Sequence, residues 1–187
     1  MSLINTDFKA DDMEKKIILL FIFEKMEFPL TDQSIGEIIV ANSSWMNYMD
    51  FRDAIVNLVE SKFIHRGRHG ADALFHLTAQ GRACLGHFYT TIPASVREEI
   101  MEYAKANKQR FKRNQEYTYD YFKNSDGSHT VLLRIKEYGN LENLLEVRMK
   151  VNTRSDAIKF ANKWKEKAPH AYEALLNILS EEEQEGI

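Results

Sequence analysis

The chain has 187 residues, and its 25 lysines and arginines against 28 aspartates and glutamates give a formal net charge of −3, which argues against non-specific coating of nucleic acid. A single cysteine, Cys84, excludes an internal disulfide and a multi-cysteine zinc site. Because the longest apolar run, residues 17–23, is shorter than the roughly 20 residues that cross a bilayer, and the N-terminus lacks a signal-peptide pattern, we expect a cytoplasmic protein that enters no membrane.

The first 60 residues are predicted to form three helices. Residues 11–26 are apolar all round at their centre, which indicates a buried helix, and the Phe-Pro-Leu at 28–30 ends it. Thr31 is a suitable N-cap for a second helix that ends at 42–44. Asp50 is expected to cap a third helix, whose inner face carries Phe51, Ala54, Ile55, Leu58 and Val59. Three helices with short breaks are typical of a helix-turn-helix unit.

A β-hairpin is predicted next. Residues 63–66 and 73–77 have strand character, and the Gly-containing stretch 67–72 is expected to be the loop between them. Thr78 is then placed to cap a further helix, with Gly81 and Leu85 at fixed offsets behind it. In a winged helix this hairpin is the wing.

The second half changes from helical to alternating periodicity. A helix is expected over 94–112, and it ends in a run of basic residues from Lys105 to Arg113. Three strands follow, with Tyr117, Tyr119 and Tyr121 on one strand face, and the Asn-Ser-Asp-Gly at 124–127 predicts the first turn. Two helices are then expected, separated at Pro169. For the three tyrosines we prefer a place in the core or in a dimer interface over a ligand-binding or RNA-stacking face.

Together these patterns predict an α+β protein with three parts. Residues 8–90 form an N-terminal winged helix-turn-helix domain, and residues 91–115 a connecting helix. Residues 116–187 form a β-β-β-α-α domain for dimerisation or signal sensing. Residues 1–90 hold nine basic and twelve acidic residues, and the remainder sixteen of each, so any DNA contact has to come from local patches of positive charge.

One motif carries the fold assignment, namely Leu-Thr-x-x-Gly-x-x-x-Leu at 77–85, directly after the hairpin. It resembles the wing exit of many bacterial winged-helix regulators. Over nearly its full length the chain resembles an uncharacterised winged-helix family of Gram-positive, largely anaerobic bacteria, a domain of unknown function. The matching residues are Ile-Ile-Leu-Leu at 17–20, Phe-Pro-Leu-Thr at 28–31, Asn-Tyr at 47–48, the motif itself, Ile-Pro at 92–93, the C-terminal strands and the Trp164 helix. The resemblance implies a predicted transcriptional regulator, without an activity, ligand or target.

The third helix is the expected recognition helix. Its first turns would present side chains to the edges of bases in the major groove, with Arg52 suited to guanine and Asn57 to adenine. The candidate DNA-binding residues here are Asn47, Tyr48, Arg52, Asp53 and Asn57. Because Asp50 and Asp53 repel phosphate, a solvated face or a protein contact is the alternative for this helix.

The hairpin is the second candidate DNA contact. Arg66 and Arg68 flank Gly67, and His65 and His69 lie beside them, so the wing has a positive tip suited to phosphates or to the minor groove. The alternative is a solvated hairpin. His65, His69 and His76 raise the question of zinc, but no acidic or cysteine ligand converges on them, and we expect neither a metal nor a cofactor.

The sequence contains no phosphate-binding glycine loop and no nucleophile or zinc-protease motif, so we do not expect an enzyme. Cys84 is expected to be a small buried residue. The first hypothesis is a transcriptional regulator that binds double-stranded DNA as a homodimer, with an unknown small-molecule effector possible. The alternative is a winged-helix protein-interaction module without DNA binding, for which the acidic third helix is the evidence. A weaker third hypothesis is that the C-terminal sheet binds a small ligand or RNA.

Overall fold

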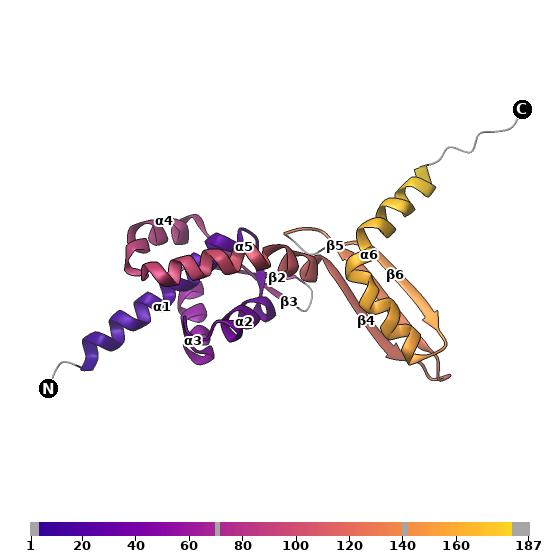
Figure 1. Cartoon of the computed structure of the whole chain (residues 1–187), viewed down its shortest axis with the longest axis horizontal. Coiled ribbons are helices and arrows are strands. Elements are labelled where there is room, and N and C mark those ends of the chain that lie inside the picture. Colours follow the sequence, from indigo (N-terminus) through magenta and orange to yellow (C-terminus); the bar gives the residue numbers. More distant parts are fainter. Residues whose placement is uncertain (1–3, 70–71, 140–141, 181–187) are drawn as a thin grey trace, which may run out of the picture. The chain divides into compact units, whose positions relative to one another are not determined.

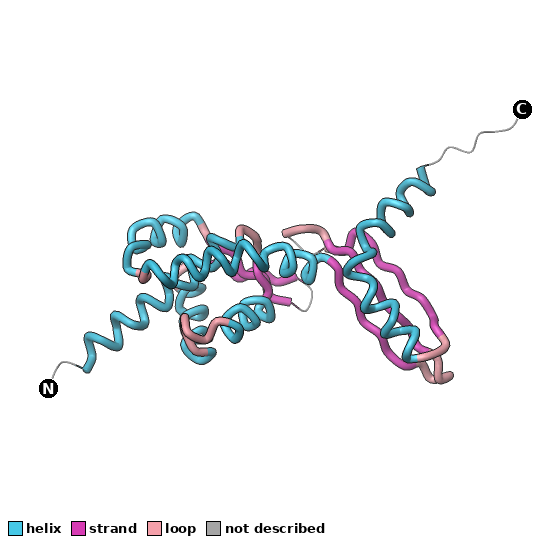
Figure 2. The backbone as a smooth tube through the Cα atoms, in the orientation of Figure 1, coloured by secondary structure: helices cyan, strands magenta, loops and turns pink. Residues whose placement is uncertain are grey.

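The structure is a computed structural model that describes the backbone of residues 4–69, 72–139 and 142–180, and the side chains of residues 12–67, 73–139 and 142–180. Over these residues it is a mixed α+β structure with six α-helices and two three-stranded antiparallel sheets (Figures 1 and 2). Two units, residues 1–111 and 112–187, meet inside the long helix α5 (Ala94–Glu116). None of the described helices combines the length and apolar character needed to span a membrane.

Three helices open the first unit, α1 (Ile4–Met26), α2 (Asp32–Ala41) and α3 (Tyr48–Glu60). The centre of α1 is buried on all sides as predicted, since every residue from 17 to 23 is inaccessible. The predicted N-cap of α2 is also confirmed, because the Thr31 hydroxyl accepts a hydrogen bond from the amide of Ser34 at 3.1 Å.

The predicted N-cap of α3 is wrong. Asn47, and not Asp50, has the extended backbone of a cap, and its Oδ1 accepts a hydrogen bond from the amide of Asp50 at 2.9 Å. Asp50 therefore occupies the third helical position, where its carboxylate in turn accepts a bond from Asn47 Nδ2 at 2.8 Å. Both residue types make good caps, and the reciprocal pair forms only when the asparagine comes first, three residues ahead.

The first sheet has the strand order β1-β3-β2, with β1 (Leu30–Thr31), β2 (Ile64–His69) and β3 (Asp72–Leu77). The predicted hairpin is present, and its strand pairing extends to His69, beyond the predicted end at 66. Strand β1 was not predicted, because two residues are too few to show alternation. It joins the sheet through Leu30 opposite Phe75 and Thr31 opposite Leu74.

The Leu-Thr-x-x-Gly motif ties the end of the hairpin to its beginning. Thr78 caps α4 (Ala79–Phe88) as predicted, because its hydroxyl accepts from the amide of Gly81 at 3.0 Å. The same hydroxyl donates to the carbonyl of Lys62 at 2.8 Å, and the Thr78 amide donates to the carbonyl of Phe63 at 3.0 Å. A Cβ on Gly81 would lie 2.1 Å from that Phe63 oxygen. Glycine is therefore required by the close approach of the two chain segments. A short 3-10 turn, η1 (Tyr89–Thr91), then leads to α5.

The second unit is a sheet covered on one face by a helix. Strands β4 (Tyr117–Lys123), β5 (His129–Lys136) and β6 (Asn143–Val151) pair in chain order, and α6 (Arg154–Ser180) packs against them. Trp164 lies in this interface, where its Nε1 donates to the carbonyl of Arg134 at 3.0 Å. Tyr117 and Tyr119 pack against the core as preferred, whereas Tyr121 is exposed.

The prediction of two C-terminal helices is wrong, and the described unit is β-β-β-α. Helix α6 continues through Pro169. A proline inside a helix removes one hydrogen bond and crowds the carbonyl four residues earlier, at a cost of about 3 kcal/mol. Pro169 lies on the exposed side of the helix, while its neighbour Ala168 is fully buried against the sheet. Packing on both sides of the proline keeps the helix continuous.

Two glycines of α4 give a matched test of the motif. Gly81→Ala should destabilise the first unit by about 2–3 kcal/mol, because the new methyl group collides with backbone. Gly86→Ala, in the same helix with nothing within 4 Å of the added Cβ, should be neutral or stabilising by up to about 1 kcal/mol. Urea unfolding followed by Trp45 fluorescence in a Trp164→Phe background reports the first unit alone. Equal effects of the two substitutions would contradict the close approach at Gly81.

Candidate nucleic-acid interface

Helix α3 has one buried and one exposed side. Its buried residues are Phe51, Ala54, Ile55 and Leu58, and α1 is the helix that it contacts most. The opposite side is exposed, and of the predicted DNA-binding residues Asp53 lies there, with Tyr48 and Asn57 exposed at its two edges. Asn57 Nδ2 donates to the carbonyl of Asp53 at 2.7 Å, so part of its amide is occupied within the helix.

Two apolar side chains share this exposed side of α3. Met49 is 68 % exposed and Val56 is 53 % exposed. Met49 was not among the predicted site residues, although its neighbours Asn47 and Tyr48 were. With Asn47 as the cap, residues 49, 53 and 56 follow helical spacing, and that spacing is the signal that identifies Met49. We call Tyr48, Met49, Asp53, Val56 and Asn57 the α3 face.

The side chains of Asn47 and Arg52 already bind other residues of the protein. The Asn47 side chain is engaged in the cap of α3. Arg52 Nη1 donates to both carboxylate oxygens of Asp32, at 2.7 and 2.9 Å. Arg52 is the one basic residue between 48 and 60, so α3 offers no unpaired cation. Because the Arg52 and Asp32 side chains are 42 % and 46 % exposed, this ion pair contributes only about 0–1 kcal/mol to stability.

Several other cations of the first unit are also paired with carboxylates. On α1, Lys15 lies 2.7 Å from Asp50 and Lys16 lies 2.8 Å from Asp12. Further ion pairs join segments that are far apart in sequence, namely Arg82 with Glu24, Lys108 with Glu27 and Arg110 with Glu37.

The β2–β3 hairpin holds one of the exposed cations of the first unit that no ion pair joins to another described side chain; Lys62 and Lys105 are others. Arg66 is exposed, and no ion pair joins it to another described side chain. Its guanidinium lies 5.7 Å from the centre of the Phe75 ring, on the opposite strand. A cation held over an aromatic face in this way keeps its hydrogen-bond donors available. The side chains of Arg68 and His69, the other predicted arginine and histidine of the hairpin, lie outside the described residues.

The histidines of the hairpin pair with each other across the strands. His65 is exposed, and its ring centre lies 4.8 Å from that of His76. Partial burial, and then the neighbouring His65, lower the pKa of His76, which keeps its imidazole neutral at physiological pH. Among the described residues, His, Cys, Asp and Glu side chains nowhere gather in a group of three that could hold a metal.

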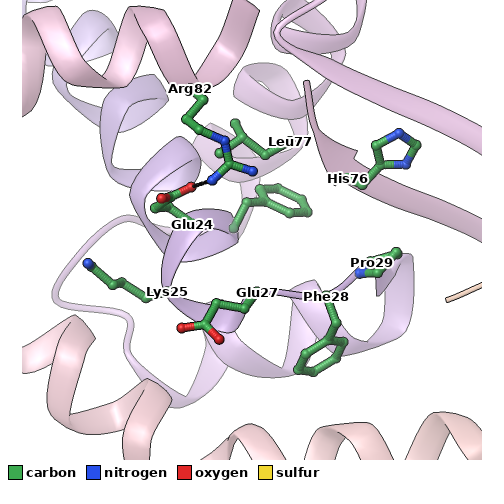
Figure 3. A pocket seen from close by; sticks show the side chains of 9 residues that line it. Glu24, Lys25, Glu27, Phe28, Pro29, His76, Leu77 and Arg82 are labelled. Carbon is green, nitrogen blue, oxygen red and sulfur yellow. Dashed lines mark hydrogen bonds and ion pairs between the residues drawn. The ribbon is translucent and has the colours of Figure 1, made fainter. Parts of the chain in front are cut away.

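Beside the hairpin, a cavity of about 400 Å³ opens between the end of α1, strand β3 and α4 (Figure 3). Arg82 reaches across it to Glu24, and His76 stands at its edge. A hydrogen bond from Lys108 lowers the pKa of Glu27, a carboxylate that also lines this cavity. Both acidic residues of the lining already have cationic partners, so neither offers an unpaired carboxylate to a ligand.

A second cavity, of about 320 Å³, is mostly apolar and lies between α1, α3 and α4. Cys84 lines it and is half-buried, so the expected burial of this cysteine is only partial. The thiol lies at the edge of the core, where burial raises its pKa. The thiol therefore stays protonated at neutral pH and is a weak nucleophile.

Comparison with known proteins gives one family. No curated protein and no solved structure matches the chain. A family described as "Domain of unknown function (DUF4364)" matches residues 15–179. The match runs from the middle of α1 almost to the end of α6 and so includes both units. The chain therefore belongs to the DUF4364 family, an uncharacterised domain family, as the sequence resemblance anticipated.

Proposed function

We propose that this protein is a DNA-binding transcriptional regulator whose residues 8–90 act as a winged helix-turn-helix domain. The observation that carries the proposal is the combination of α2 and α3, joined by a short turn, with an antiparallel hairpin that presents an exposed arginine. In winged-helix proteins the second helix of such a pair enters the major groove and the hairpin contacts the adjacent backbone. The protein would act by binding in the cytoplasm, without catalysis.

Arg66 is the residue we assign to phosphate contact. It is exposed on β2, and no described carboxylate competes for it. Each phosphate contact adds nearly one unit to the dependence of log affinity on log salt. Because the one cation of α3, Arg52, is paired with Asp32, the hairpin is better suited than α3 to an anionic ligand. His65, beside it, supplies a further hydrogen-bond donor.

Base contact by α3 requires Arg52 to change partners. The Arg52–Asp32 pair is half-exposed and stabilises the protein little. A bidentate contact with guanine contributes about 1–3 kcal/mol of discrimination between bases, which exceeds the free energy of the pair. We therefore propose that Arg52 leaves Asp32 when a guanine is within reach, while Asn57 and Tyr48 offer uncharged hydrogen-bonding groups beside it.

The C-terminal unit would serve assembly or signal sensing in this proposal. Its helix and sheet have their own core, and thus a scaffold separate from the DNA-binding residues.

The experiment is selection of genomic DNA fragments by the purified full-length chain, followed by affinity measurements across a salt series. We expect selected fragments to bind more tightly than random duplex, with an affinity that falls steeply as salt rises. If no fragment exceeds random DNA at low salt, the proposal fails.

Arg66→Ala should weaken binding to selected and random duplexes by a similar factor. The slope of log affinity against log salt should fall by about one unit, because one phosphate contact is lost. Arg148→Ala removes an exposed arginine from β6 in the second unit and is the matched control, expected to leave the slope unchanged. Equal effects of the two substitutions would show that Arg66 has no special role.

A second candidate function, a protein-interaction module without DNA binding, is favoured by the composition of the α3 face. Met49 and Val56 are largely exposed, and Asp53 lies between them along the helix. Apolar side chains around a carboxylate suit a protein partner with a complementary basic group. In this alternative the α3 face binds a partner protein, and the hairpin is exposed to solvent without a ligand.

Asp53→Asn distinguishes the two functions. If α3 enters a groove, removal of this carboxylate should tighten binding to any duplex by about three- to tenfold at low salt, since one like-charge repulsion disappears. Glu166→Gln, at an exposed position of α6, is the control and should leave DNA affinity unchanged. The protein-interaction function predicts no DNA binding by the wild type and none by either variant.

A further inference from the structure

Helix α6 has an apolar stripe that continues beyond the sheet that it covers. The stripe recurs every three or four residues, through Ala157, Ala161, Trp164, Ala168, Tyr172, Leu175 and Leu179. Its first four members are buried and Tyr172 is half-buried. Figure 1 shows the last turns of α6 projecting past the strands, so the sheet does not cover the end of the stripe.

The uncovered end of α6 exposes four large aliphatic side chains within five residues. Leu175 is 36 % exposed, Leu176 50 %, Ile178 67 % and Leu179 75 %. Isolated apolar residues at a surface are ordinary, but a contiguous set on one helix side marks an interaction site. The family match extends to residue 179, so this segment belongs to the shared domain. We call residues 171–179 the α6 end.

From this arrangement we infer that the α6 end pairs with the α6 end of a second copy of the chain, antiparallel and about a two-fold axis near Leu175. In such a pair Ala171 of one copy faces Leu179 of the other, so that a small residue meets a large one. The same surface serves both copies, as a two-fold interface requires.

The charge distribution along α6 selects a second copy and the antiparallel direction. Residues 154–170 contain five basic and two acidic residues, whereas residues 171–187 contain five acidic residues and no basic one. A parallel pair would place the acidic segments side by side. In an antiparallel pair the chain direction carries the acidic C-terminal sequence of each copy toward the basic segment of the other, and the two helix dipoles are opposed. The acidic segment also disfavours an anionic membrane surface as the occupant.

The first test measures association of the full-length chain by sedimentation velocity from about 1 to 200 µM. We expect a dimer whose population rises with concentration. Leu175→Glu combined with Leu179→Glu should raise the dissociation constant at least about tenfold, because carboxylates then face the apolar contact. Asn177→Glu, on the opposite side of the same helix, is the control and should change it by less than about twofold. A wild-type monomer throughout, or a dimer that the double substitution leaves intact, overturns the inference.

A second test reads the direction of the pair without disturbing its packing by charge. In a Cys84→Ser background, Leu175→Cys should form a disulfide-linked dimer. Leu179→Cys should cross-link only when mixed with an Ala171→Cys chain, because a disulfide requires Cα atoms within about 7 Å. Efficient cross-linking of Leu179→Cys with itself would overturn the antiparallel arrangement. Both tests are independent of DNA, so their failure leaves the proposed function untouched.

Discussion

The hydrogen bonds that join Thr78 to residues 62 and 63 determine the shape of the first unit. They join the residue that follows the hairpin to the two residues that connect α3 to the hairpin. The Phe63 carbonyl also approaches Gly81 so closely that no side chain fits at that position. The start of α4 is thereby held against the segment that follows α3, so that the two ends of the hairpin are fixed to each other. Any role of α3 and the hairpin in binding one ligand depends on this closure, because it holds the two elements in register.

The second constraint is electrostatic. Several cations of the first unit pair with its own carboxylates, as Arg110 with Glu37 and Lys15 with Asp50 illustrate. Arg52 follows the same rule, and this leaves the α3 face apolar and acidic. A DNA-binding function for this chain therefore has to rely on the hairpin for phosphates and on exchange of a weak ion pair for base contact. Binding of that kind would be selective, and its salt dependence would report the phosphate contacts made by the hairpin.

Local chemistry made part of this structure predictable. Thr31 and Thr78 were recognisable as caps, because the features that identify a cap lie within a few residues of it. Features that depend on distant contacts were not predictable. The partner of Arg52 is 20 residues away, β1 exists only through pairing with β3, and the sheet beneath Ala168 keeps α6 helical through Pro169. Asn47 was not recognised as the N-cap of α3 for another reason. Asn47 and Asp50 are both suitable cap residues and lie three residues apart, so residue type alone could not distinguish them.

The most direct test of the account is to observe which residues contact DNA. Backbone amide resonances of the isotope-labelled chain can be followed while a selected duplex is added. We predict that shifts concentrate in residues 47–57 and 64–67, and that the strands from 117 to 151 remain largely unchanged. Shifts that are absent, or that concentrate in the second sheet, would contradict the assignment of α3 and the hairpin as the DNA-binding surface.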